Sequence, residues 1–221
     1  MVHLIAYKRV GPHNNRMRSI SCFRDPAYGP LWRRAGLLVA AVLASAGAAG
    51  DELPRAALDD ARRASTELVT SVRSELLKAI EASGPLRAIV VCKYTVPEIA
   101  SAVSRKYGAR VTRVSLTPRN PALGWGDAWE QKVLMDFDNK VAKGDKPEGL
   151  DYAEVTTEPS GKFMRYMRAL PMLPACMSCH GPAEQISESI REQLAHDYPH
   201  DRALGLVVGK VRGAVSYKKP L

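Results

Sequence analysis

The chain has 221 residues, 46% of them hydrophobic and 25% charged, and a formal net charge of +9. This length and composition predict one compact domain and exclude disorder as the working state. Residues 1–50 hold seven basic residues and one acid, so the rest of the chain has a net charge of only +3 and gives little reason to expect a nucleic-acid partner.

The first 50 residues have the parts of a leader with a signal peptide. The basic pair Arg33-Arg34 stands directly before an uncharged, Ala-rich run over residues 35–49, and the acidic pair Asp51-Glu52 follows it. The run has 15 residues, fewer than the roughly 20 that a membrane-spanning helix needs, and its small residues offer cleavage sites. We therefore expect a periplasmic protein with no stable membrane span after cleavage, and a single domain over residues 51–221.

A long amphipathic helix is predicted at the start of this domain. Apolar residues recur at steps of three or four from Leu53 to Ile80, with charged residues between them, and Gly84-Pro85 ends the pattern. A short apolar run over residues 88–91 then leads into Cys92 and fits either a strand or a buried helical turn.

The middle of the domain is predicted to alternate helices and a strand. Thr95 and Glu98 have the spacing of a capping box, and Gly108 is a plausible stop, which predicts a helix over residues 96–107. A strand over 111–116 and a loop over 118–126 follow. The next helix, from about Asp127 to Val141, is expected to bury one apolar face, made of Trp129, Val133, Leu134 and Phe137.

The last third is predicted to hold most of the sheet. Residues 151–158 and 162–170 flank Pro159-Ser160-Gly161, which is typical of a hairpin. A short helix is expected around Ile186, Ile190 and Leu194, and residues 204–208 and 211–217 are expected as closing strands. The sum is an α+β fold with a small antiparallel sheet and helices packed on one of its faces.

The most specific motif is Cys176-Met177-Ser178-Cys179-His180, a C-x-x-C-H array. This spacing is the attachment signature of c-type haem, because two sulfurs three positions apart can form thioethers to the vinyl groups of one porphyrin edge. The adjacent His180 is then carried beneath the iron as the proximal ligand. A thioredoxin motif, half of a zinc site and a plain disulfide are the alternatives, but neither a βαβ pattern nor a second paired ligand spacing accompanies the motif. One motif predicts one covalently bound haem c.

The second axial ligand is not determined by spacing. The candidates are Cys92, His196, His200 and several Met and Lys side chains. A methionine is more often core filler than ligand, and the two histidines stand in a polar stretch. Cys92 would be an unpaired thiol in an exported protein, which favours a ligand role, but a buried inert cysteine fits as well. The residues alone leave these two interpretations of Cys92 equally open.

Several separated blocks point to a known family. They are Cys92 followed by Val96-Pro97-Glu98-Ile99-Ala100, Arg113-Val114-Ser115, Arg119-Asn120-Pro121, Asp127-Ala128-Trp129-Glu130, the C-x-x-C-H motif, Tyr198-Pro199 and Gly213-Ala214-Val215-Ser216. In this order, from about residue 55 to the end, the chain resembles a bacterial domain-of-unknown-function family of exported c-type haem proteins. The resemblance implies a PAS-like fold, with His180 as proximal and Cys92 as distal ligand.

The resemblance favours a haem-based redox or gas sensor that acts through a redox or signalling partner protein and binds a small gas. A periplasmic electron-transfer carrier is the alternative, and a haem or thiol oxidoreductase is the third hypothesis. We expect no enzyme, because no distal acid/base set accompanies the motif. By charge alone, Arg87, Lys93 and Arg119 are candidate partners of the haem propionates or of a Cys92 thiolate.

Overall fold

The structure, a computed structural model, describes residues 53–221, and the predicted leader over residues 1–50 lies outside the described residues. The first element is the 29-residue helix α1 (Arg55–Ser83), which confirms the amphipathic helix predicted from periodicity. Its buried stripe includes Ala61, Ala64 and Leu68, each with 0% exposure. Within residues 53–221, no helix combines the length and the apolar character that a membrane crossing requires.

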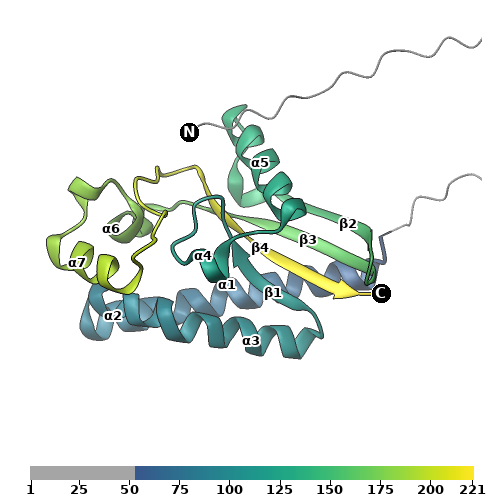
Figure 1. Cartoon of the computed structure of the whole chain (residues 1–221), viewed down its shortest axis with the longest axis horizontal. Coiled ribbons are helices and arrows are strands. Elements are labelled where there is room, and N and C mark those ends of the chain that lie inside the picture. Colours follow the sequence, from purple (N-terminus) through teal and green to yellow (C-terminus); the bar gives the residue numbers. More distant parts are fainter. Residues whose placement is uncertain (1–52) are drawn as a thin grey trace, which may run out of the picture. The chain divides into compact units, whose positions relative to one another are not determined.

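Four antiparallel strands form one sheet with the order β1-β4-β3-β2. Their bounds are β1 (Arg110–Val114), β2 (Asp151–Glu158), β3 (Gly161–Pro171) and β4 (Val211–Pro220). The last strand in the chain therefore lies between the first strand and the hairpin of β2 and β3 (Figure 1). The predicted hairpin is confirmed, as is the α+β class with a small antiparallel sheet.

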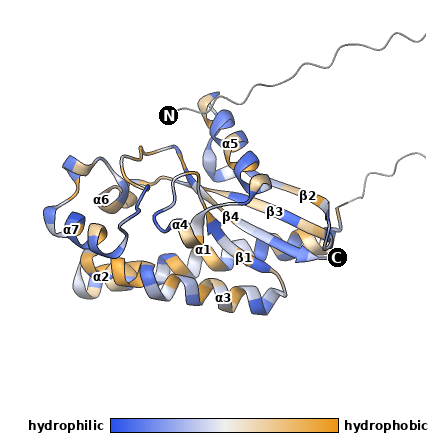
Figure 2. Cartoon of the chain, viewed as in Figure 1, coloured by the Kyte–Doolittle hydropathy of each residue, from blue (hydrophilic) through white to orange (hydrophobic). Residues whose placement is uncertain are grey.

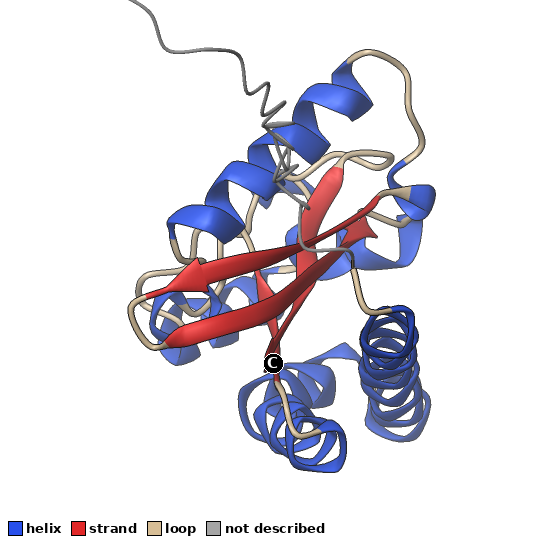
Figure 3. Cartoon of the chain, turned by 90° about the vertical axis from the view of Figure 1, so that its right-hand side faces the viewer, coloured by secondary structure: helices blue, strands red, loops and turns tan. Residues whose placement is uncertain are grey.

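Helices cover both faces of this sheet, so the prediction of one covered face is wrong (Figure 3). On one face, α1 and α3 (Val96–Tyr107) share a core with Tyr166 of β3. On the other, α5 (Ala128–Ala142) shares a core with Met167, the next residue of the same strand. Successive side chains of a strand point to opposite faces, and the four consecutive residues 164–167 of β3 are all buried, as expected of a strand covered on both sides.

The chain remains helical through the segment that carries Cys92. Helix α2 (Pro85–Val90) passes into a π-helical turn, Val91–Thr95, and then into α3. Thr95 has helical backbone angles of φ −74° and ψ −37° and makes no side-chain cap, so the predicted capping box is wrong. A capping residue needs a non-helical backbone, which a chain arriving from another helix does not offer. The predicted stop is confirmed, because Gly108 is left-handed with φ 59°.

The C-terminal third packs a short helix against α2. Helix α7 (Glu188–Asp197) confirms the predicted helix, and Ile190 and Leu194 pack with Ile89 of α2. Figure 2 shows α2 as one of the most hydrophobic stretches of the ribbon, which explains why it needs this cover. Of the two predicted closing strands, residues 211–217 lie in β4, whereas residues 204–208 form an irregular loop.

Candidate functional site

A cavity of about 580 Å³ opens beside β1, within the range of about 300–1,000 Å³ typical of cofactor sites. Its walls come from the π-helical turn, α3, β1, the following loop and the start of β4. Cys92 and His180 both line it, although they are far apart in the sequence. Among the His, Cys and Met residues of the described chain, these two alone contribute to its walls. The two motif residues Cys176 and Cys179 are not among the lining residues.

His180 ends the one-turn helix α6 (Met177–His180) and is buried. Its Nδ1 lies 2.8 Å from the carbonyl oxygen of Ala203, so Nδ1 carries the proton and donates, and Nε2 keeps its lone pair. Burial, with the cations Arg212 and Arg119 nearby, lowers the pKa of His180 to about 2. The ring is therefore neutral, with Nε2 available as an acceptor or a metal ligand.

The irregular loop over residues 204–208 holds this histidine from outside the helix. The N–H of Gly205 donates to the carbonyl oxygen of Gly181 and the N–H of Leu206 donates to that of His180, each over 2.9 Å. These two N–H groups, which a closing strand could have used in the sheet, are bonded to the last residue of the motif and to the residue after it instead. This is the physical reason why the predicted strand is absent.

The two motif cysteines precede His180 on adjoining turns. Cys176 ends the 3₁₀ turn Pro174–Cys176, and Cys179 lies in α6 against the apolar cluster of α2 and α7. Both are half-buried free thiols, and burial raises the pKa of the Cys179 thiol. Arg119 donates to the carbonyl oxygen of Cys179 and forms an ion pair of 2.9 Å with Asp201, which ties the motif to the loop after β1.

Cys92 is a half-buried free thiol on the π-helical turn. The neighbouring Lys93 pairs with Asp197 over 2.6 Å, so this turn is tied to the end of α7. Lys93 and Arg119 thus already have carboxylate partners, and Arg87 is exposed and does not line the cavity. None of the three basic residues singled out from the sequence is therefore a buried cation of the cavity that lacks an anionic partner.

The other candidate ligands lie elsewhere. The side chain of His196 is 80% exposed and His200 is exposed, as their polar surroundings predicted. Met164, Met167 and Met172 are buried at 0–1% exposure, the first two in the cores on opposite faces of the sheet, so their prediction as core filler is confirmed. No three His, Cys, Asp or Glu side chains within residues 53–221 are grouped as a metal-ion site.

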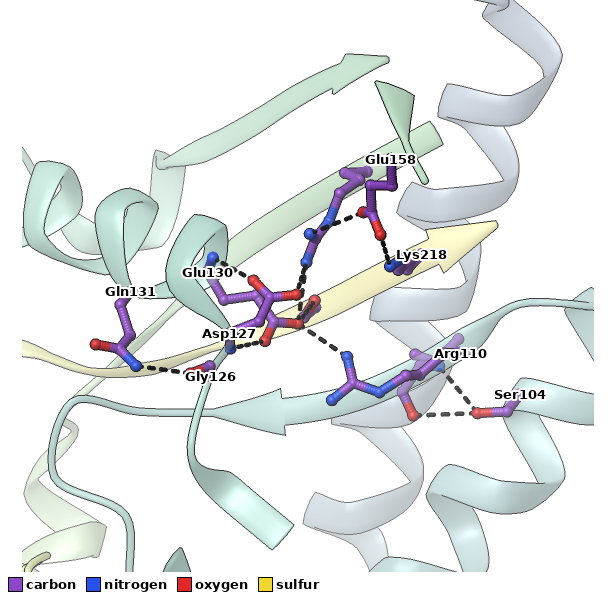
Figure 4. A network of polar contacts seen from close by, with 11 residues as sticks. Ser104, Arg110, Gly126, Asp127, Glu130, Gln131, Glu158 and Lys218 are labelled. Atoms are coloured by element: carbon purple, nitrogen blue, oxygen red, sulfur yellow. Dashed lines mark hydrogen bonds and ion pairs between the residues drawn. The ribbon is translucent and has the colours of Figure 1, made fainter. Parts of the chain in front are cut away.

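A buried polar network fixes β1 beside the cavity (Figure 4). Glu130 of α5 has 0% exposure and accepts hydrogen bonds from Arg110 over 3.0 Å, Ser216 over 2.5 Å and the N–H of Asp127 over 2.7 Å. Arg165 pairs with Asp127 over 2.6 Å at the same helix terminus. The network joins α5, β1, β3 and β4, and so it sets the position of the strand that forms one wall.

Two cavity residues were missed by the sequence reasoning. Arg113 of β1 and Arg212 of β4 both line the cavity, and a terminal nitrogen of Arg212 lies 2.6 Å from Nε2 of His180. The available signal was their place in the chain, because Arg113 opens one of the blocks that carried the resemblance and Arg212 directly precedes another.

The described chain is an α+β domain whose cavity is lined by one imidazole and one thiol. Residues 51–220 match the Tll0287-like family, and the chain belongs to this family. Among solved structures it is similar to the crystal structure of the cyanobacterial heme-protein Tll0287, with a TM-score of 0.51, 22% identity, and coverage of 75% of this chain and 93% of that chain. At this identity the likeness shows the fold alone. No curated protein sequence matches the chain.

Proposed function

We propose that this domain binds one haem c, with Cys176 and Cys179 as its thioether residues and His180 and Cys92 as its axial ligands. The observation that carries the proposal is that Cys92 and His180 line one cavity of about 580 Å³. Membership of a family that includes a heme-protein supports it. We further propose the periplasm as its location, after removal of residues 1–50, and retain the PAS-like description of the fold as part of the proposal.

The donor set suits an iron porphyrin. His180 offers a neutral imidazole whose Nδ1 is bonded to a backbone carbonyl, the arrangement common among metal-binding histidines. Its Nε2 already accepts a hydrogen bond from a guanidinium, so this atom faces a cation in the structure. Cys92 offers a thiol, and thiolates are known haem ligands. The residues present therefore fit the cofactor.

The protein's own contribution would be a ligand that can dissociate from the iron, the sulfur of Cys92. When bound, haem supplies a one-electron iron couple, which a donor protein can reduce. An electron from such a donor would lower the positive charge beside Cys92. The Cys92 thiolate would then be held less tightly and would take up a proton from solvent at Sγ. Cys92 stands on a π-helical turn, an irregularity common at functional sites and hinges, so its release can move the turn. We propose redox or gas sensing, with this movement passed to a partner protein.

The test of haem attachment is the mass of the mature protein. The full chain is produced together with a c-type haem maturation system, and the purified protein is expected to carry the added mass of one haem. Cys176→Ala and Cys179→Ala each remove a thioether, and the double variant is expected to lack covalent haem. Ser178→Ala in the same motif is the matched control and should keep it. A wild-type protein without the added mass would overturn the proposal.

Carbon monoxide separates the sensor from an electron carrier. Ferrous protein that binds CO has an open coordination position and supports sensing. Reversible reduction without ligand loss or CO binding would favour the carrier. The N-terminal sequence of the mature protein, expected to begin near the end of the run 35–49, tests the leader in the same preparation.

A further inference from the structure

The cavity holds two guanidinium groups without an anionic partner. Of its arginines, Arg110 is paired with Glu130 and Arg119 with Asp201. Arg113 and Arg212 form no ion pair with any carboxylate of residues 53–221. A third unpaired arginine on the cavity wall, Arg105, is exposed and therefore solvated.

Arg212 is directed into the cavity by an irregularity of the sheet. Leu170 of β3 pairs with Gly213 and Pro171 pairs with Val211, so Arg212 is the extra residue of a β-bulge. Bulges redirect side chains and are common beside functional sites. Gly213 has φ +154°, and a Cβ there would lie 2.5 Å from the carbonyl oxygen of Val114, so the bulge depends on glycine.

The surroundings of Arg212 leave it short of acceptors. One terminal nitrogen donates to Nε2 of His180 over 2.6 Å, and the buried Nε has no partner among the described residues. A buried cation whose side-chain partner is a neutral imidazole is unfavourable unless an anion joins it.

A metal ion at His180 would remove even that partner. Nδ1 is bonded to Ala203, so Nε2 has the lone pair that a metal would take, and Arg212 uses the same lone pair. The two cannot share it. Metal binding would therefore release the guanidinium of Arg212, which would then need an acceptor within the same cavity.

We propose that Arg113 and Arg212 form the anion-binding site of this cavity and bind the two propionate carboxylates of the haem. This inference rests on the proposed function and replaces Arg87, Lys93 and Arg119 in the role suggested by charge. The ligand that displaces Arg212 from His180 brings its own carboxylates, and the planar guanidinium fork suits a carboxylate because it can donate two parallel hydrogen bonds.

The test compares haem with haem dimethyl ester, in which both propionates are esterified. Binding of each to the full-length apoprotein, made without maturation machinery, is measured by absorbance titration. The wild type is expected to prefer haem by roughly tenfold or more, because charge-assisted hydrogen bonds of this kind contribute at least that factor. Arg113→Gln and Arg212→Gln are each expected to bring the ratio of the two affinities closer to one. Arg105→Gln, on the same cavity wall but exposed, should leave the ratio unchanged.

The ratio of the two affinities distinguishes loss of carboxylate recognition from general damage to the fold. Arg212→Lys keeps the charge without the fork and should retain part of the preference. A variant that weakens both ligands equally would show a structural role and overturn the assignment of that residue. Equal binding of haem and its ester by the wild type would overturn the anion site and leave haem binding intact. Failure of both ligands to bind, together with a mature protein lacking haem mass, would overturn both proposals.

Discussion

Arg212 donates a hydrogen bond to Nε2 of His180 over 2.6 Å, while Nδ1 of the same ring lies 2.8 Å from the carbonyl oxygen of Ala203. The imidazole is therefore held at both nitrogens. Its tautomer and orientation are determined by the protein before any ligand arrives, because each nitrogen has one role. Such preorganisation is what a metal-binding histidine requires.

Cys92→Ala is expected to change the ferric absorption spectrum of the haem-loaded protein. The variant loses the anionic sulfur donor, so the spectrum should lose its thiolate features, and the reduction potential should rise because a thiolate favours ferric iron. Tyr94→Phe, an exposed change on the same π-helical turn, is the control and should match the wild type. Coincident ferric spectra of Cys92→Ala and wild type would exclude Cys92 as a ligand.

The domain is expected to lose stability at alkaline pH because of two tyrosines in its core. Burial raises the pKa of Tyr166 and of Tyr217 to about 12, above the usual value of 10.0. The unfolded chain therefore releases these protons first, so the stabilisation is full below pH 10 and is lost between about pH 10 and pH 12. Each tyrosine contributes roughly 2–3 kcal/mol to this loss. Urea unfolding from pH 8 to pH 12 measures it, and a flat profile would contradict the prediction.

Phenylalanine variants separate the two tyrosines. The Tyr217 hydroxyl is buried without a partner among residues 53–221, so Tyr217→Phe should be neutral or stabilise by up to about 1 kcal/mol at pH 7. The Tyr166 hydroxyl bonds to Asp151 over 3.1 Å, so Tyr166→Phe should cost about 1 kcal/mol. Each variant should also remove its own share of the alkaline loss. Equal changes in the free energy of unfolding for the two variants at pH 7 would contradict the prediction that only the Tyr166 hydroxyl makes a stabilising hydrogen bond.

Glu130→Ala is expected to destabilise the domain by about 3–5 kcal/mol, because it removes a fully buried carboxylate and leaves the Ser216 hydroxyl and the N–H of Asp127 without their acceptor. The matched control is Asp136→Ala on the solvent side of the same helix. Asp136 forms an exposed pair with Lys140 over 2.8 Å, and such pairs contribute about 0.3–0.5 kcal/mol. Urea unfolding at pH 7 measures both, and similar costs for the two variants would show that the network contributes little.

Gly213→Ala is expected to disrupt the bulge that directs Arg212. The backbone at φ +154° is strained for alanine, and the new Cβ would meet the carbonyl oxygen of Val114, so a loss of about 2 kcal/mol or more is expected. Gly149→Ala is the control, because nothing lies within 4 Å of its Cβ position. Thermal unfolding measures the loss. An unchanged midpoint for Gly213→Ala would mean that the bulge tolerates a side chain.

Elements with local causes could be predicted from the sequence. The apolar spacing of α1, the Pro159-Ser160-Gly161 turn and the Asp127 cap of α5 each involve residues within a few positions of one another. The errors lie where a segment outside the predicted element changes what its residues do. Thr95 has the side chain of a cap, but the helix that precedes it makes a cap unnecessary. The loop over 204–208 has strand-like residues, but two of its amides donate to the carbonyl oxygens of His180 and Gly181.

The C-x-x-C-H motif and the chemistry it implies can be recognised from five consecutive residues, because their spacing along the chain is enough to define the motif. The placement of Cys92 and His180 on the wall of one cavity has no such local cause. It depends on packing of α2 against α7 and on the position of β1 beside β4, which long-range burial controls. The same holds for Arg212, whose direction follows from one extra residue in the pairing of two strands.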